Sequence, residues 1–149
     1  MQAADPAYEQ RTRDSFARQN AMQTLGATLE SVAPGRVTIT MAHRDSLTQQ
    51  HGFIHAGMLA AALDSACGYA AFSLMPADAA VLTIEFKVNL LAPARGPRFR
   101  IEGQVIKPGR TISVVEGRAF EHADGEAGKF VATMTATVMT VQGREALRH

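Results

Sequence analysis

Residues 56–75, AGMLAAALDSACGYAAFSLM, decide the fold of this chain. About 20 apolar residues can cross a bilayer, but seven of these twenty are Ala, two are Gly, and Asp64 lies near the middle. A helix that is apolar nearly all round must otherwise be enclosed by protein on most sides. Because the rest of the chain has the alternating apolar and polar residues typical of a soluble sheet, the stretch predicts a long helix buried inside a soluble protein.

Alternation of apolar and polar residues predicts strands on both sides of this helix. The clearest run is 82–90, a period of two over nine residues, which predicts a strand with one buried face. Further alternating runs follow at 99–105, 111–120 and 130–138, separated by turn signals that contain Pro or Gly. Residues 24–42 predict a hairpin. Four consecutive strands with short connections form an antiparallel meander.

These elements predict an α+β protein in one piece. An antiparallel sheet of five to six strands curls around the long helix, because small helix side chains let the sheet approach closely. Residues 6–23 predict a short, weakly amphipathic helix lying on this core, and the polar tail 142–149 is expected to be mobile. We expect a single domain over residues 1–149, with a core at about 24–141.

Composition and charge exclude several classes of protein. With 149 residues, 46% of them hydrophobic and 19% charged, the chain is neither a disordered tail nor a fibre. A net charge of +1 creates no general field that favours nucleic acid or an anionic membrane. Cys67, the single cysteine, cannot form an internal disulfide, and the first twenty residues hold no apolar run typical of a secretory signal. We expect a cytoplasmic protein without nucleic acid or membrane partners.

Asp64 is the residue that a buried helix does not explain. No cationic side chain lies within a helical turn or two of it along the sequence, and burying an ionised carboxylate costs several kcal/mol. One interpretation is that Asp64 faces solvent or a subunit interface and forms hydrogen bonds only with the backbone. The other is a general base or nucleophile in an apolar cleft, with a pKa open to tuning by desolvation.

The start of the long helix offers a second chemical group. Backbone N–H groups in the first helical turn lack internal partners, and the helix dipole favours negative charge there, so this end can hold an oxyanion. From Ala56 to Asp64 is eight steps of about 1.5 Å, roughly 12 Å, whereas both groups must lie about 3 Å from the reacting atoms. If both act on one carbonyl, they come from two copies of the chain in a symmetric dimer. The strand 82–90 is the candidate for pairing across the two-fold axis.

These residues resemble the hotdog-fold acyl-CoA thioesterases of the PaaI-like group. The resemblance rests on His55-Ala-Gly57, on Asp64 nine residues after the His, and on the turn Lys-Pro-Gly-Arg-Thr at 107–111, and it spans roughly residues 24–141. It implies a hotdog fold and hydrolysis of an acyl-CoA thioester to a free acid and CoA. CoA is then part of the substrate, and no further cofactor or metal is expected. We expect the chain to form at least a homodimer, and a homotetramer is the open alternative.

The resemblance also implies roles for single residues. Asp64 matches the carboxylate that attacks the thioester or activates a water, and Thr83 matches a Ser or Thr that helps position it. Ala56 and Gly57 match two glycines whose N–H groups hold the thioester oxygen, and alanine keeps that donor where its φ is negative. His55 matches a residue that helps to set up this turn. The catalytic positions so implied are Asp64, Gly57, Ala56, His55, Gln49 and Thr83, with Gln49 an amide near the thioester.

Coenzyme A also needs cations for its phosphates. Basic residues are expected to cluster at strand ends and turns of the meander, and a turn with Gly109 can bring backbone N–H groups to an anion. A solvated charged rim is the alternative interpretation for each of them. The nucleotide-binding residues that we expect are Arg95, Lys107, Gly109, Arg110 and Thr111.

Two other functions stay open at this level. One is a non-catalytic acyl-CoA sensor or binding module with the same fold, and the other is a hotdog hydratase or dehydratase. The position of the carboxylate on the helix favours the hydrolase. The acyl group is not defined, since a medium-chain aliphatic and an aryl group both fit.

Overall fold

The computed structural model describes residues 1–123 and 128–143. Its helices are α1 (Tyr8–Ala17), α2 (Asn20–Leu25) and α3 (Ala56–Phe72), with a short 3-10 turn at Asp45–Leu47. Its strands are β1 (Thr28–Ala33), β2 (Arg36–Ala42), β3 (Ala80–Leu90), β4 (Arg98–Lys107), β5 (Ile112–His122) and β6 (Lys129–Val141). Most of the tail predicted to be mobile, residues 144–149, lies outside the described residues, as do loop residues 124–127.

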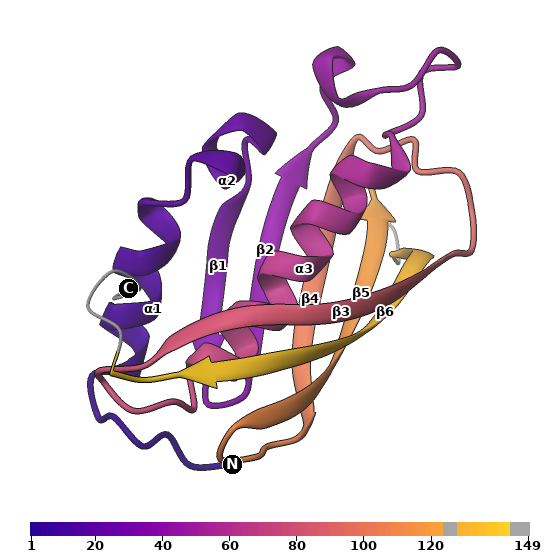
Figure 1. Cartoon of the computed structure of the whole chain (residues 1–149). Helices are drawn as coiled ribbons and strands as arrows, with labels where there is room; N and C mark the ends of the chain where they lie inside the picture. The colour runs from indigo at the N-terminus through magenta and orange to yellow at the C-terminus, as the bar shows by residue number, and fades with distance from the viewer. Residues whose placement is uncertain (124–127, 144–149) are drawn as a thin grey trace.

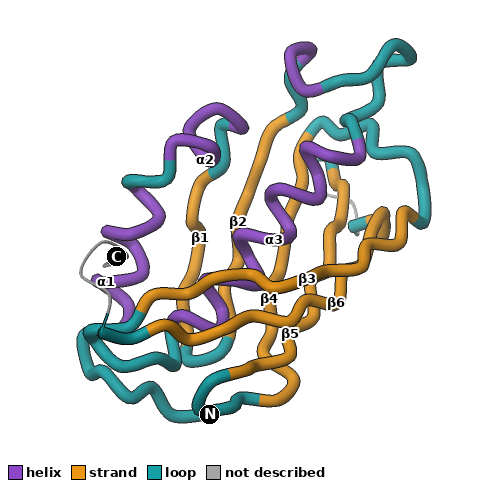
Figure 2. Tube along the Cα trace, in the orientation of Figure 1, coloured by secondary structure: helices purple, strands orange, loops and turns teal. Residues whose placement is uncertain are grey.

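The strands form one antiparallel six-stranded sheet in the order β1-β2-β4-β5-β6-β3. The sheet curls around α3, which crosses its concave side (Figure 1). The chain traces the hairpin β1-β2, then α3, then β3 at the opposite edge, before β4, β5 and β6 fill the sheet between them (Figure 2). The predicted hairpin, helix and strands are confirmed, but the predicted four-strand meander is wrong: of its strands only β4, β5 and β6 are consecutive neighbours, because β3 pairs with β6 and not with β4.

Small residues bring α3 against the sheet. Twelve of its 17 residues are buried, and the helix contacts β2, β3, β4, β5 and β6. Gly103 of β4 shows how close the approach is, because a Cβ atom on it would lie 2.1 Å from the carbonyl oxygen of Ala66. A glycine is therefore required at this crossing of strand and helix.

The N-terminal region differs from the single helix expected over 6–23. It folds as two helices, since the backbone of Gln19 is extended (φ −81°, ψ 99°) between α1 and α2. Both helices pack on α3, with Phe16 edge-on to Tyr69 at 5.6 Å between ring centroids. Arg11 fixes α1 to the end of α3, since its guanidinium donates to the carbonyl of Met75 at 2.7 Å and to Asp5 at 2.8 Å.

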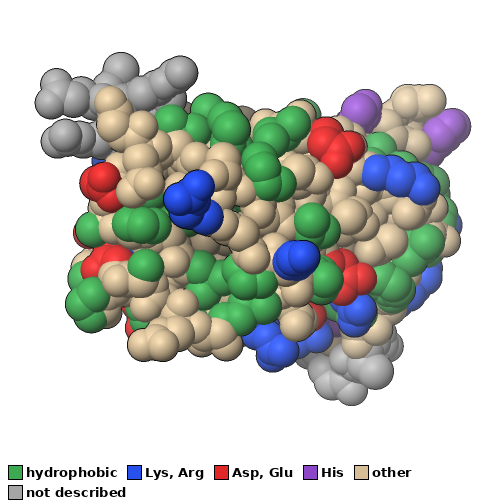
Figure 3. Space-filling view, turned by 60° about the horizontal axis from the view of Figure 1, so that its bottom comes forward, with side chains coloured by type: hydrophobic (Ala, Val, Ile, Leu, Met, Phe, Trp, Pro, Cys, Tyr) green, Lys and Arg blue, Asp and Glu red, His purple; other side chains and the backbone are tan. Residues whose placement is uncertain are grey.

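Strand β3 is the edge of the sheet, and the prediction of a buried face is wrong for the single chain. Leu82, Ile84, Phe86 and Leu90 are 42%, 54%, 44% and 54% exposed. A bulge between Thr83 and Glu85 shifts the register against β6, so the strict alternation of the sequence does not place all apolar side chains on one face. In the space-filling view, hydrophobic side chains lie in several groups between isolated charged ones (Figure 3).

Candidate functional site

Asp64 lies in the middle of α3 and is held by the edge strand. Its side chain is half-buried, and Oδ1 accepts a hydrogen bond of 2.7 Å from the Thr83 hydroxyl. None of the ion pairs in the described part of the chain involves Asp64. Thr83 therefore orients a carboxylate that has no counter-ion, and Oδ2 is left for a further partner.

A cavity of about 220 Å³ opens beside this carboxylate. We call it the carboxylate pocket, and its lining comes from α3, from the start of β3 and from the segment between α1 and α2. It is lined by Gln19, Asp64, Ser65, Gly68, Tyr69, Val81, Leu82 and Thr83.

The start of α3 leaves one backbone donor free. His55 caps the helix, and its Nδ1 atom accepts a hydrogen bond of 2.9 Å from the Gly57 N–H. The N–H groups of Met58 and Leu59 both donate to the carbonyl oxygen of His55. Within the described residues, the Ala56 N–H has no hydrogen-bond acceptor. Of the two expected oxyanion donors, the Ala56 N–H is thus available, whereas the Gly57 N–H is bound to Nδ1 of His55.

The residue types at positions 56 and 57 are compatible with the backbone at the start of α3. Ala56 has a negative φ, so alanine in place of glycine keeps its donor without strain. At Gly57, a Cβ atom would lie 3.1 Å from Nδ1 of His55, which is tighter than ordinary van der Waals contact. Glycine therefore allows the imidazole to cap the helix.

A second cavity, of about 400 Å³, lies at the same end of the helix. We call it the helix-start pocket; it is mostly apolar and includes Gln49, one of the residues that the family resemblance implies for the site. Its lining residues are Gln49, Phe53, Ile54, Ala56, Leu59 and residues 90–94. The Oε1 atom of Gln49 accepts from the His51 N–H, so the amide NH2 of Gln49 remains as a donor.

One chain does not bring the two halves of the expected site together. Asp64 lines the carboxylate pocket and Ala56 lines the helix-start pocket. The two residues are roughly 12 Å apart along one straight helix, at about 1.5 Å per residue. Neither pocket alone holds both a carboxylate and a free helix N–H.

The expected nucleotide-binding residues lie at two separate places in the single chain. Arg95 lies near the start of α3, with its guanidinium 4.7 Å from the ring centroid of Phe53. Lys107 is the last residue at the other end of the ten-residue strand β4, and Gly109, Arg110 and Thr111 follow it. At about 3.3 Å per residue, this strand is roughly 30 Å long. The sequence put these cations in neighbouring turns of a meander, but successive turns lie at opposite ends of the sheet.

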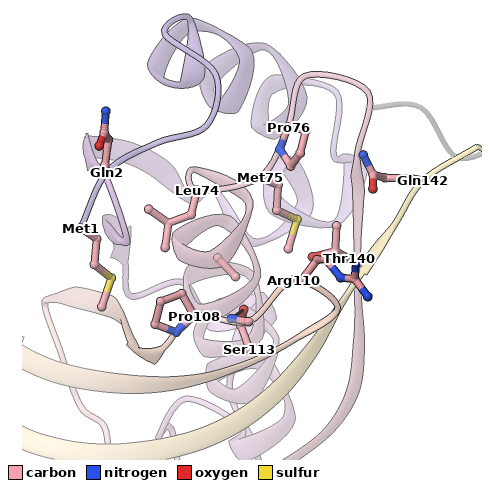
Figure 4. Close-up of a pocket in the computed structure, with 12 residues that line it drawn as sticks. Met1, Gln2, Leu74, Met75, Pro76, Pro108, Arg110, Ser113, Thr140 and Gln142 are labelled. Carbon is pink, nitrogen blue, oxygen red and sulfur yellow. Dashed lines mark hydrogen bonds between the residues drawn. The ribbon is translucent and has the colours of Figure 1, made fainter.

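Residues 108–110 form part of a third cavity, the turn pocket, of about 350 Å³ (Figure 4). It sits beside the end of α3, where Leu74, Met75 and Pro76 face Pro108 and Arg110. A Cβ atom on Gly109 would lie 2.0 Å from the carbonyl oxygen of Ile112, so the tight turn needs glycine there. The Gly109 N–H donates to the Ser113 hydroxyl at 3.1 Å, and Thr111 accepts from the Thr140 N–H through its carbonyl.

Sequence reasoning missed three residues of the carboxylate pocket. Ser65 donates to Oε1 of Gln19 at 3.0 Å, and the Tyr69 hydroxyl lies 3.2 Å from the Ser15 hydroxyl. Burial raises the pKa of Tyr69, so the phenol keeps its proton. Gln19 gives no signal in the sequence, because it lies in a polar segment whose contact with α3 depends on the tertiary fold.

No group of three or more His, Cys, Asp or Glu side chains within the described ranges could hold a metal ion. Over the same ranges, none of the helices has the length and apolarity that a membrane crossing requires.

The fold and the paired features on α3 define a hotdog-fold protein, and the chain belongs to the Thioesterase superfamily, whose sequence model matches residues 51–128. A crystal structure of a thioesterase family protein from Silicibacter pomeroyi is 57% identical, with a TM-score of 0.88 over 91% of this chain and 99% of that one. The PaaI protein of E. coli, from the phenylacetic acid degradation operon, shares the fold at 20% identity, with a TM-score of 0.81 over 90% of this chain and 93% of its own.

A curated relative matches a smaller share of the chain. A Saccharolobus solfataricus protein named as a candidate esterase is 36% identical over 94 residues, which are 63% of this chain and 66% of that protein. The match thus spans slightly less than two thirds of that relative's length.

Proposed function

We propose that the protein hydrolyses acyl-CoA thioesters at a site shared between two copies of the chain. The observation that carries the proposal is the separation of a counter-ion-free carboxylate, Asp64, from the free N–H of Ala56 on the same helix. Membership of the Thioesterase superfamily supplies the reaction class. Two copies placed side by side supply both groups to each of two equivalent sites.

The exposed edge of β3 is the surface through which the copies meet. An edge strand offers unpaired N–H and C=O groups to another strand, and here it also carries the exposed side chains of Ile84 and Phe86. A two-fold axis normal to the sheet near the middle of β3 pairs the strand antiparallel with its copy, in a register that brings Thr83 beside the partner subunit's Leu90. Thr83 lines the carboxylate pocket and Leu90 the helix-start pocket, so this register joins the two cavities.

The chemistry then follows from the groups present. A water gives one proton to Oδ2 of Asp64 while its oxygen attacks the thioester carbonyl, and Thr83 holds Oδ1 in place. The developing oxyanion accepts from the partner subunit's Ala56 N–H, joined by the Gly57 N–H of that subunit once its His55 ring turns away. The C–S bond then breaks, and the CoA thiolate takes the proton back from Asp64, leaving a free acid and the CoA thiol.

The same pairing brings basic side chains of both subunits to one side of the shared site. Within one chain, Arg95 lies by the start of α3, and Arg110 lies by its end. Antiparallel helices that bring the start of one α3 beside the partner's Asp64 carry the second half of the partner helix past that start. Arg95 of one subunit and Lys107 and Arg110 of the other therefore flank the helix-start side, where they bind the phosphates of CoA.

The test is thiol release from a panel of acyl-CoA esters by the purified protein. The proposal predicts catalytic release from at least one ester, a loss of two to three orders of magnitude in Asp64→Asn, and unchanged folding by circular dichroism. Binding of acyl-CoA without thiol release from any ester would contradict it and would favour an acyl-CoA sensor. Hydration of an enoyl-CoA without hydrolysis would favour the hydratase.

A further inference from the structure

The carboxylate pocket is partly built by residues outside the family match. Gln19 precedes residues 51–128 by more than thirty positions, yet it reaches α3, where Ser65 donates to its Oε1 atom at 3.0 Å. That bond fixes the orientation of the amide and leaves the Nε2 group as a donor. The N-terminal segment therefore adds a polar group of its own beside Asp64.

The placement of charge separates the acyl side of the site from the CoA side. Arg95 rims the helix-start pocket through its contact with Phe53, and the proposed dimer brings Arg110 of the partner subunit to the same side. The lining of the carboxylate pocket holds no Lys or Arg. When the thioester carbonyl lies between Asp64 and the helix start, the phosphates of CoA therefore lie on the helix-start side. The acyl group then enters the carboxylate pocket.

On this basis, which rests on the proposed function, we infer that Gln19 determines acyl specificity. The carboxylate pocket receives a compact acyl group, and the Gln19 amide donates to an oxygen substituent on it. The size limit follows from volume, since a cavity of about 150 Å³ accommodates benzene and this one has about 220 Å³. An acyl chain of about six carbon atoms that bears a hydroxyl group fits, and a sixteen-carbon chain does not.

The size limit is tested by filling the pocket at Gly68. A Cβ atom on Gly68 meets nothing within 4 Å, so Gly68→Leu can fold with its side chain in the cavity. We expect this variant to lower kcat/KM at least about tenfold more for hexanoyl-CoA than for acetyl-CoA. In the wild type, hexadecanoyl-CoA should be at least about tenfold poorer than hexanoyl-CoA. Equal use of the two esters, or an unchanged ratio in Gly68→Leu, would overturn the assignment of the pocket.

The role of Gln19 is tested with a matched pair of esters, hexanoyl-CoA and 3-hydroxyhexanoyl-CoA. Gln19→Leu should lower kcat/KM for the hydroxylated ester about tenfold more than for the plain ester, because only the former loses a hydrogen bond. Gln10→Leu is the control, since Gln10 is an exposed glutamine of α1 that bonds Asp14. An equal effect on both esters, or none on either, would overturn the inference.

A binding measurement separates this inference from the proposed function. The dissociation constants of the non-hydrolysable thioether analogues of both esters are measured by calorimetry on the wild type and on Gln19→Leu. A selective weakening of the hydroxylated analogue by about tenfold supports the role of Gln19 even if no ester is hydrolysed. Hydrolysis by the wild type, with identical binding of the two analogues by both proteins, would instead overturn the role of Gln19 and leave the proposed function standing.

Discussion

Thr83 on the edge strand β3 donates its hydroxyl to Oδ1 of Asp64 on α3 at a distance of 2.7 Å. This bond connects the exposed edge of the sheet to the carboxylate on the buried helix. The strand that offers a pairing surface to a second copy therefore also orients the group on which the proposed chemistry depends. The proposed assembly and the proposed catalysis therefore depend on the same eleven-residue strand.

Removal of this hydroxyl tests the positioning of Asp64. Thr83→Ala should lower kcat roughly tenfold with little change in KM, because a hydrogen bond to a charged group is lost while the substrate pockets remain. Thr83→Ser keeps the hydroxyl and should retain most activity. Thr135→Ala, at an exposed threonine of β6, is the control. A loss in Thr83→Ser as large as in Thr83→Ala would show that the hydroxyl is not what matters.

A charge on the edge strand tests the pairing surface. Ile84 is 54% exposed on β3, and Ile84→Lys should shift the protein to a monomer in sedimentation velocity, because a buried interface does not tolerate an unpaired cation. Thiol release should disappear together with the dimer. Ile106→Lys, at a residue of β4 that is 55% exposed, leaves the dimer intact. A dimeric Ile84→Lys protein would place the interface elsewhere.

The approach of β4 to α3 predicts a sharp effect on stability. Gly103→Ala forces a methyl group against the Ala66 carbonyl, and neither backbone can move freely. We expect the free energy of unfolding to fall by about 1–3 kcal/mol in urea titrations. Gln104→Ala, at the exposed neighbour, should change it by less than about 0.5 kcal/mol. An equally stable Gly103→Ala protein would mean that the helix sits farther from the sheet.

Burial raises the pKa of the Cys67 thiol above its ordinary value, and the negative charges of Asp64 and Glu116 add to the rise. The native thiol should therefore resist Ellman's reagent at pH 8, and one thiol per chain should react after unfolding in guanidinium. The folded state keeps a proton that the unfolded thiol loses above about pH 8.5, so stability should fall as pH rises past that point. In Cys67→Ala this alkaline decline should be smaller. Rapid labelling of the native protein would contradict the burial.

Local sequence patterns predicted the elements of this fold well. The small-residue run at 56–75 predicted the central helix because its composition allows only an enclosed position, and α3 is buried accordingly. The alternation at 82–90 predicted a strand but not its exposure, since a pattern of apolar residues does not distinguish a core from an uncovered edge. The bulge at Thr83 also escapes any periodic signal.

The site was predictable where its chemistry is local, and not where it depends on long-range placement. An isolated carboxylate and a helix start are visible in the sequence, and helix geometry alone separates Asp64 from Ala56. The positions of Arg95 and Arg110 depend on which end of a strand each turn occupies, and the contact of Gln19 with Ser65 depends on packing between distant segments. Neither leaves a trace in local composition.

Complementation between two inactive variants tests the shared site most directly. Asp64→Ala removes the carboxylate, and Ala56→Pro removes the free N–H at the first helical position, where proline is well tolerated and the extended backbone of His55 suits it. Each pure variant should be nearly inactive. Subunits mixed by joint unfolding and refolding should recover about a quarter of wild-type thiol release, because about half the dimers are mixed and each has one intact site. Activity no greater than the sum of the two parents would contradict a site built from two chains.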